Sequence, residues 1–181
     1  MCKKAILHLP KLVILLTIIT LGGIFLKNNL GKVVAEENVI DFTERAVFSR
    51  NNPRDVYAID LDRDNDVDIL AGYADSGITA WYENDGSENF NEHMIRISNS
   101  AVNSVYAIDV DSDGDIDVLN ASDYSGSVYD TIAWYENNGS EYFTEHVITN
   151  SADTARSVYA IDVDNDYDID VLGTSSYYDT V

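Results

Sequence analysis

Residues with a strong preference for β-strands flank a run of acids in three segments of the chain. The segments are VYAIDLDRDNDVDIL at 56–70, VYAIDVDSDGDIDVL at 105–119 and VYAIDVDNDYDIDVL at 158–172. Each segment carries an Asp at every second position through its middle. Alternate residues of a strand point to the same face, where like charges destabilise a sheet. The acids are therefore expected in a loop that connects two strands.

Other patterns return together with the acid runs. Tyr57, Tyr106 and Tyr159 take the same place in the three segments, and they are 49 and 53 residues apart. An Asn/Asp-Gly turn of the kind that closes hairpins follows an apolar run in the first two repeats. The recurring pieces are AWYENDGS at 80–87 and AWYENNGS at 133–140, then FNEHMI at 90–95 and FTEHVI at 143–148, with FTERAV at 42–47 as a partial copy.

Each repeat predicts four short strands, which in the middle repeat are VYAIDV, IDVL, TIAWYEN and FTEHVIT. Four strands in about 50 residues are the plan of a β-propeller blade. No helical apolar period is sustained after residue 35, so helices are not expected. We predict an all-β fold of β-propeller type over residues 36–181, with four-stranded blades in about three repeats.

The predicted propeller is incomplete. The third repeat stops before its expected third strand, and the chain opens with only a fourth strand at 42–48. Closed propellers typically have about four to eight blades. An unpaired strand edge invites association with another chain. We therefore expect self-association through this edge, or a longer gene product.

The first 35 residues have the layout of an export signal. Lys3 and Lys4 precede an apolar run at 12–26, and small residues follow near 35. The run is short for a membrane span, which needs roughly 20 residues. We expect a secretory signal peptide at 1–35 with a mature chain that begins at Glu36, and a membrane anchor is the alternative. Either reading places the repeats outside the cytoplasm.

Charge is distributed unevenly along the chain. All five Lys and no acid lie in the first 35 residues, so the remaining 146 carry six Arg and 32 acids, a formal charge of −26. Such a surface repels nucleic acid and anionic membranes and attracts cations. The only Cys is Cys2, so no disulfide can stabilise the exported part.

DVDSDGDID inside a four-strand repeat resembles the FG-GAP and VCBS repeats of bacterial extracellular proteins and integrin-type propellers. The resemblance covers about residues 39–181. The FG-GAP tripeptides are not evident, so the VCBS-like branch is closer. The resemblance implies a calcium ion in the loop between the first two strands of each blade. It also implies a role in adhesion or ligand binding, or as a non-catalytic module of a larger secreted protein.

The acid runs also point to Ca²⁺ on their own chemistry. Ca²⁺ takes six to eight oxygen ligands in flexible geometry, whereas Mg²⁺ demands a strict octahedron and zinc or copper prefers His or Cys. In D-x-D-x-D-G-x-x-D, positions 1, 3, 5 and 9 can offer carboxylates and position 7 its backbone carbonyl. The candidate metal residues are Asp60, Asp62, Asp64, Asp66, Asp68, Asp109, Asp111, Asp113, Asp115, Asp117, Asp162, Asp164, Asp166, Asp168 and Asp170.

The three loops are not expected to be equal. Position 6 turns sharply, and it is Asn65, Gly114 or Tyr167. Gly and Asn tolerate left-handed backbone angles and Tyr does not, so the middle loop should be the best site. An EF-hand needs a Glu at position 12 and flanking helices. Position 12 here is Ala71, Asn120 or Gly173, which excludes that motif.

Other residues are weaker candidates. His93 and His146 recur at one place of the repeat, as do Trp81 and Trp134, which indicates packing more than catalysis. Tyrosines in expected loops are better candidates for a ligand-binding face: Tyr124, Tyr129, Tyr177 and Tyr178. G-x-S-x-G, H-E-x-x-H and a Gly-rich phosphate loop are absent. We predict a binding or scaffolding module for an extracellular protein or glycan, not an enzyme. The alternative is a segment of a larger secreted hydrolase or lyase.

Overall fold

Antiparallel β-structure makes up the regular part of the computed structural model, which describes residues 24–26, 33–35, 38–40, 44–123 and 130–176. No helix occurs within these ranges, and in particular none that is long and apolar enough to cross a membrane. The expected signal or anchor at 1–35 and the four candidate tyrosines Tyr124, Tyr129, Tyr177 and Tyr178 lie largely or wholly outside the described residues.

Two four-stranded sheets form the body of the molecule. The first blade has the order β5-β6-β7-β8 and the second has the order β9-β10-β11-β12, so each sheet is a simple up-and-down meander. Their strands are β5 (Pro53–Ile59), β6 (Asp68–Tyr73), β7 (Ile78–Asn84), β8 (Phe90–Ile97), β9 (Ala101–Ile108), β10 (Asp117–Asp123), β11 (Thr131–Asn137) and β12 (Phe143–Thr149).

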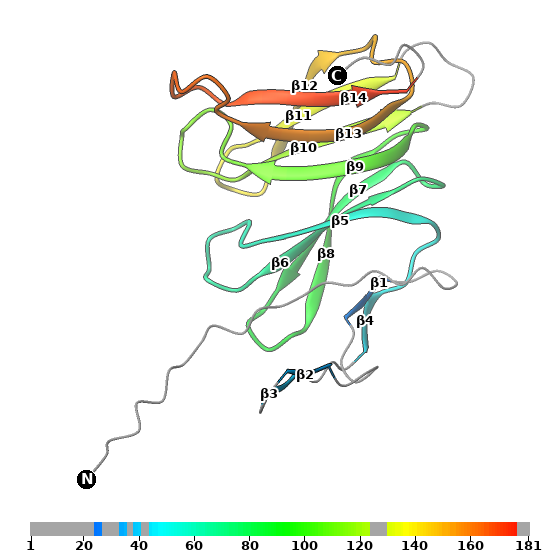
Figure 1. Ribbon diagram of the computed structural model, residues 1–181, viewed down its shortest axis with the longest axis vertical. Helices are drawn as coiled ribbons and strands as arrows, with labels where there is room; N and C mark the ends of the chain where they lie inside the picture. The colour runs from blue at the N-terminus through cyan, green and yellow to red at the C-terminus, as the bar shows by residue number, and fades with distance from the viewer. Residues whose placement is uncertain (1–23, 27–32, 36–37, 41–43, 124–129, 177–181) are drawn as a thin grey trace.

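A two-stranded hairpin follows the second blade. It consists of β13 (Ala155–Ile161) and β14 (Asp170–Ser175) and is called the C-terminal hairpin. The first blade packs on the second, and the hairpin packs on the other side of the second (Figure 1). Among the described residues the sheets do not close into a ring. The all-β, propeller-type fold with four-stranded blades is confirmed, and so is its open form.

Short strands precede the first blade. These are β1 (Ile24–Leu26), β2 (Val33–Ala35), β3 (Asn38–Ile40) and β4 (Arg45–Phe48), in the pairs β1-β4 and β2-β3. β4 includes the end of the partial copy FTERAV. Phe48 at its end packs on Tyr82, with ring centroids 5.1 Å apart. Val47, the last residue of the partial copy, and Phe48 thus both pack against a core cluster of the first blade.

The first and second strands of each repeat differ in extent from the sequence prediction. β9 begins at Ala101, four residues before the expected start, and ends at Ile108 before the first acid. β10 continues to Asp123, past the expected end at Leu119. The two extensions pair with each other, with Ala101 opposite Asp123. Pairing between neighbouring strands therefore lengthens both beyond their apolar residues.

The cores lie between the sheets. Leu70 and Trp81 of the first blade pack against Val118 of the second, and Leu119 of the second packs against Val158 of the hairpin. The ring of Tyr106 contacts the rings of Tyr57 and Tyr159, with centroids 4.8 and 4.6 Å away respectively. A face of a blade is therefore buried where the neighbouring sheet packs against it.

Candidate metal centres

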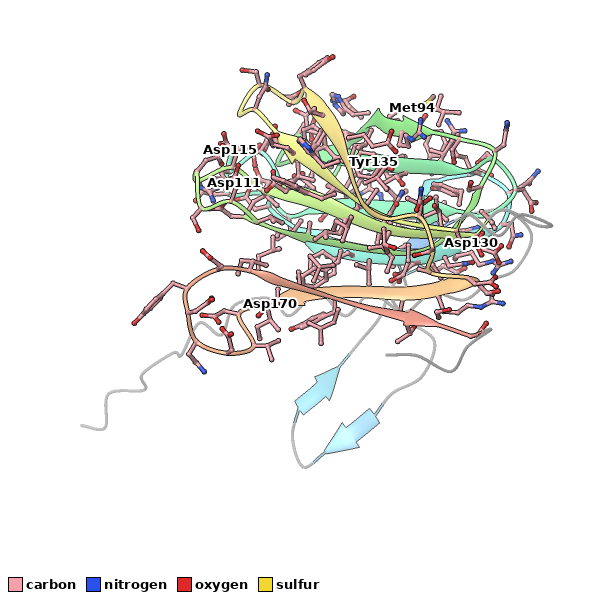
Figure 2. All side chains as sticks on the ribbon, turned by 90° about the horizontal axis from the view of Figure 1, so that it is seen from above. Met94, Asp111, Asp115, Asp130, Tyr135 and Asp170 are labelled. Atoms are coloured by element: carbon pink, nitrogen blue, oxygen red, sulfur yellow. The ribbon has the colours of Figure 1, made fainter. Side chains whose placement is uncertain are left out.

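Each acid run forms the loop that joins the first strand of a repeat to its second. The first acid loop (60–68) joins β5 to β6, the second (109–117) joins β9 to β10, and the third (162–170) joins β13 to β14. Only position 9 belongs to a strand, as its first residue. In Figure 2 Asp111 and Asp115 lie at one end of the stacked sheets, and Asp130 lies at the other.

Positions 1, 3 and 9 of each loop come together. In each trio, one carboxylate oxygen from every residue lies within 4.8 Å of the other two. Three acids separated by two and six residues in sequence are thus close enough to share one cation. The trios are Asp60, Asp62 and Asp68 in the first loop, Asp109, Asp111 and Asp117 in the second, and Asp162, Asp164 and Asp170 in the third.

Position 9 anchors the loop to the sheet in both blades. Asp117 is fully buried and accepts backbone N–H groups from Val110 at 2.9 Å and Asn137 at 2.8 Å. Asp68 is equally buried and accepts the equivalent pair of amides, each at 2.9 Å. Burial raises the pKa of both carboxyls, and the amides and the neighbouring Trp indoles that face them only partly offset this effect.

In the two blades, position 1 leaves one carboxylate oxygen without a partner among the described residues. Asp60 Oδ2 accepts the amide of Asn65 at 3.0 Å, and Asp109 Oδ2 accepts the amide of Gly114 at 3.1 Å. The other oxygen, Oδ1, is buried in both residues and has no hydrogen-bond donor among the described residues. A buried carboxylate oxygen without a donor or cation costs free energy. Both blades therefore contain an oxygen that a cation would satisfy.

Position 3 of the first loop lies in the field of its neighbours. Burial raises the pKa of Asp62, and the charges of Asp68, Asp64 and Asp60 raise it further, while the amide of Asp64 lowers it. Like charges this close disfavour ionisation, and an opposite charge reverses that effect. The first loop is thus poised to gain from a bound cation.

Positions 5 and 7 have other partners. At position 5, Asp64 and Asp113 each accept the amide two residues later, both at 2.8 Å, and neither belongs to the trio of its loop. At position 7, Asp115 lies against the hairpin turn that holds Gly139, where an added Cβ would overlap its carboxylate. Asp66 lies against Gly86 in the same way. The position 7 side chains therefore point toward the turn between the third and fourth strands of their own blade.

Sequence reasoning assigned those glycines to hairpin turns and missed their second role. Gly86 and Gly139 do adopt left-handed angles, with φ of 74° and 72°. They must also leave room for the carboxylates of Asp66 and Asp115. The signal that could have shown this is the joint recurrence of the turn and the acid run in both blades.

Position 6 has a left-handed backbone in all three loops. φ is 77° at Asn65, 104° at Gly114 and 78° at Tyr167. Gly adopts such angles without steric cost, Asn tolerates them, and Tyr is strained by them. The sharp turn predicted for position 6 is present even where the residue type disfavours it.

The third loop is built less completely than the other two. Asp170 at position 9 is exposed. Among the described residues it accepts a hydrogen bond from one backbone amide, that of Val163, at 3.0 Å. At position 1, Asp162 Oδ1 accepts two amides, from Asn165 at 2.6 Å and Asp166 at 3.2 Å. The oxygen that is free in the blades is thus already bonded here.

Charged and aromatic neighbours surround the loops. Arg63 of the first loop reaches to 3.9 Å from Asp109 of the second. His93 stacks on Trp81 with centroids 4.5 Å apart, and its Nε2 lies 2.8 Å from Glu83. His146 repeats both contacts in the second blade. The contacts of the two histidines therefore recur with the blade.

A model of the FG-GAP-like repeat family matches the chain twice, at residues 60–120 and 109–173. Each match begins at position 1 of an acid loop and ends in the second strand of the next repeat. The expected resemblance to FG-GAP repeats is thereby confirmed, and the finer choice of a VCBS-like branch stays a prediction. No curated protein matches the chain.

Proposed function

The chain belongs to the family of FG-GAP-like repeat proteins, and we propose on this basis that it is an exported, calcium-binding module of β-propeller type that acts in adhesion, ligand binding or scaffolding. FG-GAP repeats commonly bind calcium and are typical of extracellular proteins. The proposal concerns the repeats at 36–181, preceded by a signal peptide or anchor at 1–35.

The observation that carries the calcium proposal is the buried Oδ1 of Asp60 and of Asp109, which has no hydrogen-bond donor among the described residues, in carboxylates that each belong to a close trio. Hydrogen bonds within the loop leave this oxygen unsatisfied. A cation held by positions 1, 3 and 9 would satisfy it and would offset the mutual repulsion of the trio. Position 7 would contribute its backbone carbonyl, and position 5 would complete the shell.

The donor set favours Ca²⁺ over other ions. Every candidate ligand is an oxygen, which disfavours zinc and copper. Ca²⁺ accepts six to eight oxygens in irregular arrangements, whereas Mg²⁺ needs an octahedron and retains its waters. When bound, the ion would supply the positive charge that fixes the loop between two strands. Its role would be structural, since the loops tie the first strand of each blade to the second and third.

The module acts by binding and not by catalysis. His93 is paired with Glu83 and stacked on Trp81, and the second blade repeats this arrangement. Catalytic constellations are built from groups that converge on one cleft, not from contacts that recur in every repeat. The expected partner is an extracellular protein or a glycan. Repeats of this kind also fit a non-catalytic segment within a larger secreted enzyme.

Thermal unfolding with calcium, magnesium or chelator tests the calcium proposal. A ligand at a hundredfold excess over its dissociation constant stabilises the folded state by about 2.7 kcal/mol for each site. In a domain of this size that corresponds to a Tm change of roughly 5 to 10 °C for one site. We expect calcium to raise Tm by at least this amount and magnesium to raise it less. Equal Tm values in calcium and in chelator would refute calcium binding.

Two matched substitutions identify the ligands in the second loop. Asp109→Asn removes a charged ligand at position 1 and should lower both the calcium affinity and Tm in calcium. Asp115→Asn removes the same charge at position 7, where the side chain faces Gly139, and should have a smaller effect. A larger loss in Asp115→Asn than in Asp109→Asn would show that the ligand assignment is wrong.

A further inference from the structure

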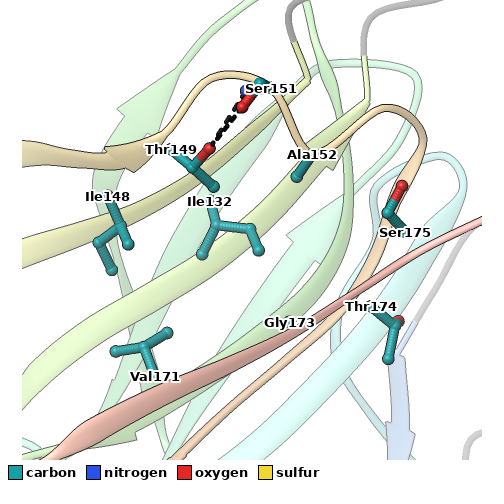
Figure 3. Close-up of a pocket in the computed structure, with 9 residues that line it drawn as sticks. All are labelled: Ile132, Ile148, Thr149, Ser151, Ala152, Val171, Gly173, Thr174 and Ser175. Carbon is teal, nitrogen blue, oxygen red and sulfur yellow. Dashed lines mark hydrogen bonds between the residues drawn. The ribbon is translucent and has the colours of Figure 1, made fainter. Parts of the chain in front are cut away.

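Two cavities of the molecule differ in the charge of the side chains that line them. The cavity between the second blade and the C-terminal hairpin measures about 270 Å³, and none of the nine described residues around it is charged (Figure 3). A cavity of about 90 Å³ lies between the first acid loop and the turn that joins β11 to β12. Its lining includes Asp62, Arg63, Asp115 and Glu141. Charges of both signs therefore meet where the first blade faces the second acid loop.

Arg63 supplies the positive charge of the smaller cavity. It stands at position 4 of the first acid loop and is the only Arg or Lys in the three acid loops, since position 4 is Ser112 in the second and Asn165 in the third. Arg63 Nη2 lies 3.9 Å from Asp109 Oδ2, and Nη1 lies 3.5 Å from the place that an added Cβ on Gly114 would take. A guanidinium from the first blade thus lies against the acid loop of the second.

The shape of the first acid loop determines where the Arg63 side chain begins. Position 4 has a left-handed backbone in all three loops, with φ of 64° at Arg63, 63° at Ser112 and 65° at Asn165. Residues of different type therefore make the same turn, which does not depend on the Arg. Arg63 also lies between Asp62 and Asp64, at positions 3 and 5 of its own loop. One candidate metal centre thus places a positive charge beside the next.

Arg63 approaches the second loop as a charge and not as a hydrogen-bond donor. Its distance of 3.9 Å from Asp109 Oδ2 exceeds the length of an N–H···O hydrogen bond, about 2.7 to 3.2 Å. Asp109 Oδ2 already accepts the amide of Gly114 at 3.1 Å, and Oδ1 has no donor among the described residues. Arg63 therefore offsets part of the negative charge at Asp109 and leaves Oδ1 available to a cation.

A fixed positive charge beside this carboxylate acts in opposite directions in two states of the loop. Without a cation, it attracts Asp109, Asp111 and Asp117, whose like charges otherwise repel one another. With a divalent cation held by the same three carboxylates, it repels that cation. The guanidinium thus stabilises the empty loop relative to the filled one.

We propose that Arg63 is a tethered counter-ion of the second acid loop, which stabilises this loop without calcium and lowers its affinity for calcium. This role rests on the calcium site proposed above and deepens it, because control of that site is assigned to a residue of the neighbouring blade. Arg63 acts here by its charge and is not a ligand of the ion.

Calorimetric titration of the whole protein with calcium tests this role. Arg63→Gln keeps most of the side chain and removes its charge, so it should raise the calcium affinity of the second loop about threefold or more at low salt. The gain should shrink in about 1 M salt, where the screening length is about 3 Å. Arg63→Lys keeps the charge and should retain most of the wild-type affinity. Arg54→Gln removes the same charge from an Arg that donates to Asn103, and it should leave the affinity unchanged.

Two further measurements distinguish regulation of the site from a purely structural role. Asp109→Asn weakens the second site, so adding Arg63→Gln to it should raise the calcium affinity much less than in the wild type. In chelator, Arg63→Gln should lower Tm by about 1 to 3 °C, because the empty loop loses its counter-ion. A residue with a purely structural role would lower Tm in chelator and in calcium alike and would leave the affinity unchanged.

The outcomes separate the role of Arg63 from the calcium site itself. Equal calcium affinities of the wild type and Arg63→Gln, with binding by both, would overturn the role of Arg63 and leave the site standing. A lower affinity in Arg63→Gln would overturn it too, since Arg63 would then stabilise the filled loop. Failure of both proteins to bind calcium would overturn the site and its regulation together.

Discussion

The second blade and the C-terminal hairpin share an almost identical sequence and differ in what surrounds it. VYAIDVDSDGDIDVL and VYAIDVDNDYDIDVL form the same two strands and the same acid loop. Leu119 is fully buried in the first of these segments, and Leu172 is 39% exposed in the second. Asp117 is buried with two amide partners, whereas Asp170 is exposed with one.

The difference shows that the local sequence forms the loop and its two strands, whereas the surrounding sheets bury their residues. The acid run and its apolar flanks form a hairpin with a trio of carboxylates even where the described residues provide no third strand. The third strand then supplies the amide of Asn137 to Asp117, and the next sheet covers Leu119. We therefore expect equal substitutions to cost more in the second blade than in the hairpin, by amounts that follow burial and hydrogen bonding.

The largest expected difference concerns the leucine of the second strand. Leu119→Ala creates a cavity between the second blade and the hairpin and should lower the free energy of unfolding by about 3 kcal/mol. Leu172→Ala removes a side chain that is already partly in water and should cost less than about 1 kcal/mol. Urea unfolding of the two variants measures both values. Equal losses would mean that the face of the hairpin is covered in solution.

An intermediate difference is expected at position 9 of the acid loop. Asp117→Ala leaves the amides of Val110 and Asn137 without their acceptor and should lower the free energy of unfolding by about 2 to 3 kcal/mol in calcium. Asp170→Ala exposes one amide that water can reach, and it should cost about 1 kcal/mol or less. The comparison is made by urea unfolding in saturating calcium. A larger loss in Asp170→Ala would contradict the role assigned to the third strand.

The repeat made most of the fold predictable from sequence. Strand preference at both ends of each acid run, and the Asn/Asp-Gly turns, located all four strands of the second blade, and the third and fourth match β11 and β12 to the residue. The outer ends of the first two strands were missed, because the extension from Ala101 to Ser104 depends on pairing with β10 and not on its own residues. Pairing across strands is not encoded in a local pattern.

The candidate metal centres were predictable as loops but not in detail. Sequence spacing offered positions 1, 3, 5 and 9 as side-chain ligands, and the structure brings together positions 1, 3 and 9. The spacing could not show that Asp109 Oδ1 has no donor among the residues that the structure describes, or that the carboxylate of Asp115 lies against Gly139. Both depend on which backbone amides surround each carboxylate, and those amides come from segments far apart in the chain.

The smallest expected effect concerns position 6 of the third loop. Tyr167 is 89% exposed and held at a φ of 78°, so its ring makes little contact that could offset the strain of a left-handed backbone. Such strain costs roughly 1 to 2 kcal/mol, while Gly adds unfolded-state entropy worth about half of that. Tyr167→Gly should therefore raise the free energy of unfolding by up to about 1 kcal/mol and tighten calcium binding in the third loop.

The matched control is Tyr142→Gly, which replaces another exposed Tyr, 68% exposed, that does not have a left-handed backbone. It should lower the free energy of unfolding by about 0.5 to 1 kcal/mol, because Gly only adds entropy to the unfolded chain there.

Gly114→Tyr is the reciprocal change, at a place where an added Cβ meets only the end of Arg63. It should impose on the second loop the strain that Tyr167→Gly removes from the third. Calcium titration of all three variants would then separate backbone strain from the lack of a third strand among the described residues. If Tyr167→Gly leaves the third loop as weak as before, the exposure of Asp170 and its single amide partner account for the weakness.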